Sequence, residues 1–169
     1  MARTYEPIAT QTLGSATSTV TFSSILATYT DLILVVNFGF SGGNQTITIQ
    51  FNGDAGSNYS FTELYGSGTA AGSGRSSNQA SIYSGLQVAP STSLDNNFIM
   101  HIQNYSNTTT YKTTISRENA VTSGTYPGTN TMVGLWRSTS AISSLTMVPS
   151  NGVNFLAGSS LTLYGIKSA

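Results

Sequence analysis

The chain has 169 residues and a formal net charge of zero, and only 7% of its residues are charged, against about a quarter in ordinary globular proteins. Ser and Thr together make up roughly 30% of the chain, cysteine is absent, and His101 is the single histidine. A nucleic-acid or anionic-membrane partner would require a basic excess, and catalysis usually requires more acids, bases or thiols. We therefore expect a protein that is not an enzyme, holds no cofactor or metal, and works by surface contacts.

The length suits one domain with a buried core, because 38% of the residues are hydrophobic. A neutral chain has weak colloidal protection, which favours assembly with other subunits. The longest apolar run, Leu32 to Val36, is too short to span a bilayer. No basic segment followed by an apolar one is present near Met1, so we expect no cleaved secretion signal and folding in a reducing cytosol.

Residues 1–16 show weak alternation and contain Arg3, Glu6 and Pro7. They are interpreted as an N-terminal extended arm that grips a partner, or alternatively as a fraying terminus. Residues 17–169 then form a single β-domain.

From residue 20 onward, apolar residues alternate with polar ones at the period of a β-strand. The predicted strands cover residues 20–22, 31–38, 47–51, 59–65, 80–86, 98–102, 111–116, 131–138, 141–148 and 161–167. About ten short strands separated by Gly, Asn and Ser clusters are typical of an all-β sandwich or barrel. The glycine-rich segment Gly66 to Ser77 is predicted to be a flexible loop within this domain.

His101 alternates with Met100 and Ile102, which places it on the opposite face of its strand. A lone histidine without a serine nucleophile motif is interpreted as structural, because a catalytic triad also needs an oriented partner.

Asp54 and Glu63 form the nearest pair of carboxylates, the kind of pair that glycoside hydrolysis uses. A turn-capping or surface role is favoured, because the two residues alternate onto opposite faces. Asn52, Asp54, Ser57 and Asn58 could hold calcium, but one carboxylate supplies little charge for a divalent ion. A network of Asx turns is the favoured interpretation of this loop.

Trp136 shares a face with Met132 and Gly134 and is predicted to lie in the core, with an interface anchor or sugar-stacking platform as the alternative. Arg137, which follows it, is a candidate partner-binding residue because arginine is enriched at binding hot spots. Exposed tyrosines could also stack on carbohydrate or on a neighbouring subunit: Tyr65, Tyr105, Tyr111 and Tyr126.

Four segments, at residues 51–68, 104–117, 133–147 and 159–167, resemble a set found in small structural proteins of tailed bacteriophages, notably those of aquatic hosts. They read FNGDAGSNYSFTELYGSG, NYSNTTTYKTTISR, VGLWRSTSAISSLTM and SSLTLYGIK. The resemblance implies a virion protein with an antiparallel, jelly-roll-like β-sandwich and no catalytic residues. It implies either a capsid decoration (cement) protein or a module of a tail fibre.

We expect a decoration protein, made in the host cytoplasm and located in the virion, that binds the major capsid protein across capsomers as a homotrimer. The expected partner-binding residues are Arg3, Tyr5, Glu6, Tyr126 and Arg137. The alternative is a tail-fibre or receptor-binding module that recognises host surface carbohydrate. A polysaccharide-degrading enzyme that uses Asp54, Glu63 or Asp95 is the least favoured possibility.

Overall fold

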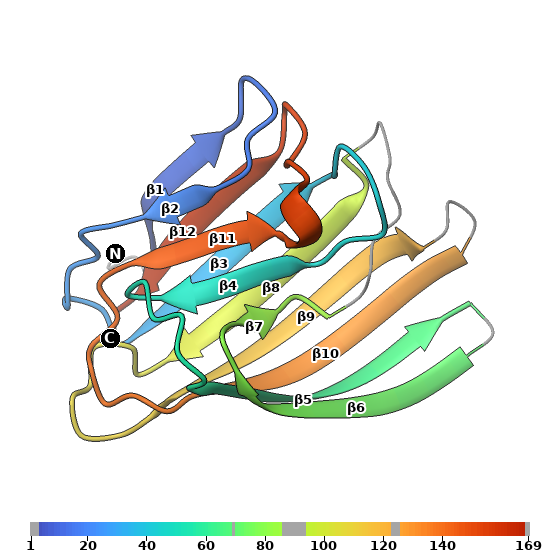
Figure 1. Cartoon of the computed structure of the whole chain (residues 1–169). Helices are drawn as coiled ribbons and strands as arrows, with labels where there is room; N and C mark the ends of the chain where they lie inside the picture. The colour runs from blue at the N-terminus through green and yellow to red at the C-terminus, as the bar shows by residue number, and fades with distance from the viewer. Residues whose placement is uncertain (1–3, 69, 86–93, 123–125, 168–169) are drawn as a thin grey trace.

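The computed structural model describes residues 4–68, 70–85, 94–122 and 126–167, which form a sandwich of two antiparallel β-sheets (Figure 1). The eight-stranded sheet has the spatial order β1 (Tyr5–Thr12), β12 (Ser160–Ile166), β3 (Asp31–Phe38), β8 (Asn96–Gln103), β9 (Lys112–Thr122), β10 (Tyr126–Trp136), β5 (Tyr59–Ser67) and β6 (Ala70–Gln79). The four-stranded sheet has the order β2 (Val20–Phe22), β11 (Leu145–Pro149), β4 (Ile47–Phe51) and β7 (Ile82–Tyr83). A 3-10 turn, Ser150–Gly152, follows β11.

The core lies between the two sheets, and its residues come from strict alternation along the strands. In β3 every second residue, from Leu32 to Phe38, is fully buried, and β4 alternates in the same way. The small sheet covers one side of the large sheet, while β5 and β6 curve away beyond its edge (Figure 1). The predicted antiparallel β-sandwich is therefore confirmed, with twelve strands in the described part of the chain.

The N-terminal segment is largely part of the sandwich. Residues 5–12, predicted to lie in an extended arm, form β1 at the edge of the large sheet and pair with β12. The register shifts between Pro7 and Ala9, which resets the side-chain alternation and explains why a period of two was not evident in the sequence. The boundary placed at residue 16 does not coincide with a break between an arm and a domain.

The prediction of a flexible loop from Gly66 to Ser77 is wrong, because these residues form the end of β5 and most of β6. Gly72 and Gly74 lie opposite Tyr65 and Glu63 in the hairpin. A Cβ atom at Gly74 would lie 2.7 Å from Glu63 Oε1, and one at Gly72 would lie 2.7 Å from the Tyr65 hydroxyl oxygen. These glycines make room for large cross-strand side chains rather than marking a loop.

Other strand limits differ from the predictions. Strand β9 extends to Thr122, whereas β11 begins only at Leu145, because residues 141–144 belong to the preceding connection. Strand β7 covers only Ile82 and Tyr83, and the predicted strand end at Leu86 lies outside the described residues.

Candidate functional site

The loop between β4 and β5 is an internally satisfied hydrogen-bond network. Asp54 Oδ1 accepts from the Gly56 N–H at 2.8 Å, and Asp54 Oδ2 accepts from Asn58 Nδ2 at 2.9 Å and from Trp136 Nε1 at 2.7 Å. Burial acts to raise the pKa of Asp54, but these three hydrogen bonds outweigh it and hold the pKa below its usual value. Because the carboxylate faces N–H donors, the arrangement is the predicted turn network rather than a calcium site.

Three aromatic rings lie behind this loop and connect the two sheets; we call Phe51, Tyr59 and Trp136 the aromatic junction. The Tyr59 and Trp136 rings are stacked, with centroids 6.2 Å apart, and the Phe51 and Trp136 centroids are 5.6 Å apart. The Tyr59 hydroxyl accepts from the Phe51 N–H at 3.0 Å and donates to the Asp54 carbonyl at 3.1 Å. The predicted core position of Trp136 is thus confirmed, with 2% of the residue exposed.

The two carboxylates considered for glycoside hydrolysis are held by different partners. Glu63 Oε2 accepts from Asn130 Nδ2 at 2.6 Å, whereas Asp54 is bound within its own loop and to Trp136. The structure therefore gives Asp54 and Glu63 separate structural roles. Over the part of the chain that the structure describes, no group of three or more His, Asp or Glu side chains could hold a metal ion.

His101 has a partner that the sequence did not reveal. Its Nε2 lies 2.9 Å from Asp31 Oδ2, and Asp31 Oδ1 accepts from the Asn104 N–H at 2.6 Å. The pair joins β8 to β3 on the solvent side of the large sheet. Strand alternation does indicate that both side chains point outward, but only the pairing of β3 with β8 brings them together.

Lys112 is an unexpected buried cation at the start of β9. Its Nζ donates to the Thr110 carbonyl at 2.8 Å and to the Thr139 carbonyl at 3.2 Å, and the residue has no exposed surface. Burial lowers the pKa of Lys112. This lysine therefore ties two connections together at one end of the sandwich.

Among the predicted partner-binding residues that the structure describes, Arg137 lies far from Tyr5 and Glu6. Tyr5 is 57% exposed on the edge strand β1, and Glu6 beside it forms an ion pair with Lys167 at 2.9 Å. Arg137 follows β10 and donates to Ser60 Oγ, the Ser57 carbonyl and Asn78 Oδ1. Strands β1 and β10 are five steps apart in the sheet, or about 24 Å. Arg3 and the side chain of Tyr126 lie outside the described residues.

The tyrosines expected on the surface differ in exposure. Tyr111 is 55% exposed and Tyr65 is 37% exposed, whereas Tyr105 is completely buried. The prediction for Tyr105 is wrong because its hydroxyl lies inside the fold, where it donates to the Leu26 carbonyl and accepts from the Tyr29 N–H.

A broad surface remains on the side of the large sheet that faces away from the small sheet, and we call it the outer face. No described strand or helix covers it, since every described strand belongs to one of the two sheets. Ile115 and Val133 are direct cross-strand neighbours on it, and together with Leu64 they are about half exposed or more. Across the sheet, the outer face is formed by Tyr164, Ile33, Val35, Ile99, His101, Ile115, Arg117, Thr131, Val133, Thr62, Leu64 and Arg75.

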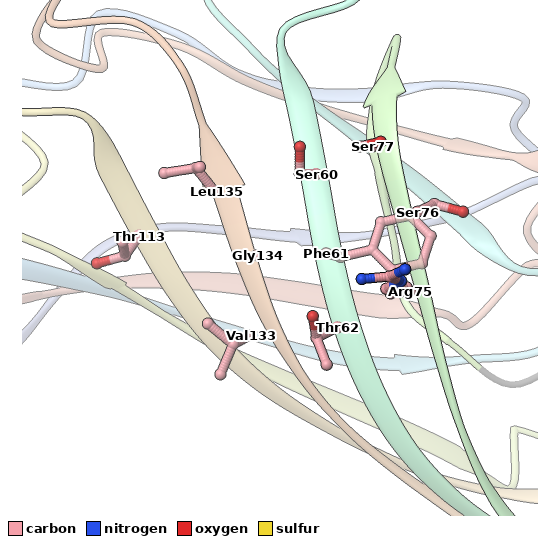
Figure 2. Close-up of a pocket in the computed structure, with 10 residues that line it drawn as sticks. All are labelled: Ser60, Phe61, Thr62, Arg75, Ser76, Ser77, Thr113, Val133, Gly134 and Leu135. Carbon is pink, nitrogen blue, oxygen red and sulfur yellow. The ribbon is translucent and has the colours of Figure 1, made fainter.

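Two depressions on the outer face have an arginine in their lining. The larger, about 650 Å³, runs between β9 and β10 on one side and β5 and β6 on the other. Figure 2 shows Thr113, Val133 and Leu135 on one side of it and Arg75 and Ser76 on the other. The smaller, about 280 Å³, is lined by Ile99, His101, Ile115, Ser116, Arg117 and Thr131. Each depression therefore combines apolar side chains with one arginine.

The sequence interpretation did not identify this surface. Alternation would have placed Arg117 with Ile115, and Val133 with Leu135, on the solvent side of their strands. The sequence gives no side for Arg75, because the glycine-rich composition of its segment predicts a loop. The outer face is the candidate functional site, and its chemistry is that of a binding surface.

No helix in the described ranges is long and apolar enough to cross a membrane. In comparisons with known proteins, no family model, no curated protein and no solved structure matches this chain.

Proposed function

We propose that this chain is a structural protein of a bacteriophage virion, a capsid decoration protein that attaches to the major capsid protein through its outer face. The identity of the virion component rests on the four segments that resemble phage structural proteins. The observation that supports binding rather than catalysis is the uncovered outer face, with exposed Ile115, Val133 and Leu64 on the adjacent strands β9, β10 and β5.

The size of the outer face is adequate for a specific interface. Eight strands are separated by seven intervals and span about 34 Å at the usual strand spacing, and eight residues of a strand span about 26 Å. The resulting area, roughly 900 Å², is similar to the ~800 Å² that each partner buries in a standard protein interface. The outer face is therefore large enough to bind a capsid surface of matching shape through a broad contact, without a deep pocket.

The distribution of acidic groups also supports a structural role. Asp54, Glu63 and Glu118 are hydrogen-bonded to side chains of the fold, and Glu6 and Asp31 form ion pairs. In this proposal the chain assembles as a homotrimer on the shell, because threefold repetition of a weak contact gives avidity.

Imaging of the intact virion by cryo-electron microscopy tests the location. We expect density for the sandwich on the outside of the head, with the large sheet toward the shell, and native mass spectrometry of the isolated chain should give the mass of a trimer. Density found only at the tail would contradict the decoration role.

A second candidate is a tail module that recognises host carbohydrate. The observation that favours it is the lining of the larger depression, which includes one arginine, Arg75, and hydroxyl groups of Ser60, Thr62, Ser76, Ser77 and Thr113. Glycan-array binding that is lost on substitution of Thr62 would support this role, and an array without binding would count against it.

A further inference from the structure

The outer face carries unpaired positive charge. Arg75 and Arg117 are both exposed, and neither forms an ion pair or hydrogen bond with a residue in the described ranges. The only carboxylate that the described strands direct to this face is Asp31, which is already paired with His101 at 2.9 Å. Two guanidinium groups therefore remain available to a partner.

A second copy of the chain is a poor occupant of this face. If its outer face were placed opposite, its strands would bring two more arginines and one carboxylate that is already paired. The other acidic residues of the strands lie elsewhere: Glu6 pairs with Lys167 at the β1 edge, and Glu63 and Glu118 point to the inner side of the sheet. Charge complementarity thus favours an acidic partner of a different kind.

The surroundings of the two arginines suit carboxylates. Arg75 shares its depression with Val133 and Leu135, and Arg117 shares the smaller one with Ile99 and Ile115. A guanidinium group binds a carboxylate through two parallel hydrogen bonds, and these strengthen when apolar contacts exclude water. Arginine is also enriched in interface cores, where lysine and acidic residues are depleted.

The spacing of the arginines limits the size of the ligand. Arg75 is on β6 and Arg117 is on β9, about 14 Å apart across the strands, and Arg117 lies two residues, or about 7 Å, farther along its strand than Ile115, which is in register with Arg75. A small carboxylic acid cannot reach both positions, whereas a protein surface can.

We propose that the outer face binds an acidic protein surface that presents one carboxylate to Arg75 and a second to Arg117, with apolar contacts to Ile115 and Val133 between them. This inference rests on the proposed function in one respect, namely that the shell protein is the partner. The arrangement of charges itself is independent of the partner's identity.

The test is co-sedimentation of the purified chain with phage heads from which this protein has been removed. Arg75→Gln and Arg117→Gln should each weaken binding about ten-fold, and the double variant should weaken it further. Lys167→Gln is the matched control, because it removes the same charge at the end of β12 and should change binding less than about two-fold. Since both arginines are exposed, thermal unfolding of the variants should match that of the wild type.

Two outcomes separate the inference from the proposed function. If the wild type binds heads and the double variant binds equally well, the decoration role stands and the inference is wrong. If the wild type does not bind heads, the decoration role is wrong, and the charge arrangement is then tested by NMR titration with poly-L-glutamate.

In that titration, resonance shifts centred on Arg75 and Arg117, lost in the double variant, support the inference. Shifts elsewhere, or equal binding of an acidic polysaccharide such as polygalacturonate, contradict it.

Discussion

Two parts of the large sheet differ in the number of polar residues that their inner sides bury. The covered half, β12, β3 and β8, packs Leu34, Val36, Phe98, Met100 and Leu163 against the small sheet, and all five are fully buried. The wing, β9, β10, β5 and β6, follows the same alternation, but beside Tyr59, Met132 and Trp136 it also buries polar residues: Lys112, Thr114, Ser116, Glu118 and Asn130. The two halves therefore share the alternation of inner and outer residues but differ in the side chains that stabilise their inner sides.

The difference indicates a division of roles within one sheet. Hydrophobic burial stabilises the covered half, whereas the wing depends on hydrogen bonds such as Ser84 Oγ to Glu118 and Asn130 Nδ2 to Glu63, and on the aromatic junction. Among the described residues, the buried oxygens Thr114 Oγ1 and Ser116 Oγ have no hydrogen-bond partner, which reduces the net stabilisation there. The wing should open more readily than the covered half.

The largest effect is expected in the covered half. Phe98→Ala removes a fully buried ring from the core and should lower the free energy of unfolding by about 3–5 kcal/mol. Urea unfolding followed by tryptophan fluorescence measures this change. A loss below about 1 kcal/mol would mean that the core of the covered half is not what stabilises the sandwich.

Alkaline pH should weaken the aromatic junction next. Burial, with a smaller contribution from the charge of Asp54, raises the pKa of Tyr59 from 10.0 to about 12. Because the folded state holds this proton more tightly, the stabilisation is complete below pH 10 and is lost as pH rises through 12, a change of about 2–3 kcal/mol. Urea unfolding at pH 9 to 12 measures the decline.

The control for this prediction is Tyr59→Phe, which should be less stable at pH 9 but should decline less between pH 10 and 12. Lys112 acts with the opposite sign, because its lowered pKa makes stability increase as pH rises toward 10.5. An equal decline in Tyr59→Phe and the wild type would assign the alkaline transition to other groups, such as Tyr105, whose pKa burial also raises.

Substitution of Asp54 should loosen the wing more than the covered half. Asp54→Ala leaves Trp136 Nε1 without its acceptor and should cost about 1–3 kcal/mol. Hydrogen exchange should become faster in β5 and β10 before it does in β3 and β8. Asp54→Asn keeps an acceptor oxygen and should cost less; uniform acceleration in all strands would argue against a separately opening wing.

The smallest effect is expected on the outer side of the wing. Leu64 is 64% exposed, so Leu64→Ala should change the free energy of unfolding by less than about 0.5 kcal/mol. Comparing this change in the free energy of unfolding with that of Phe98→Ala measures how much the outer face contributes to stability. A loss comparable to that of Phe98→Ala would show that Leu64 is buried by something in the isolated protein, such as a second copy.

Much of the covered half could be predicted from the sequence. Strands β3, β8 and β12, like β4 of the small sheet, have apolar residues at every second position, and a half-buried strand leaves that signature directly. The sequence does not predict β1 because its register shift disrupts the alternation. It does not predict β6 because glycines, which usually indicate a loop, lie there opposite large side chains of β5. In both strands the decisive contact is with another strand, which a single-sequence pattern does not contain.

In the candidate site, too, the sequence predicts local features but not the contacts between strands. Trp136 and the turn around Asp54 were predicted because the relevant signals are local. The His101–Asp31 pair, the buried Lys112 and the position of Arg75 and Arg117 on one face each depend on which strands lie side by side.

The class of fold and the scarcity of charge follow from the sequence, because strand alternation and composition are properties of the chain alone. Three features are visible only in the folded molecule: which side of the large sheet is covered, the burial of polar residues in the wing, and the position of both unpaired arginines on one exposed face. Strand order and register are set by packing between distant segments, and a period of two assigns residues to a side without indicating what covers that side.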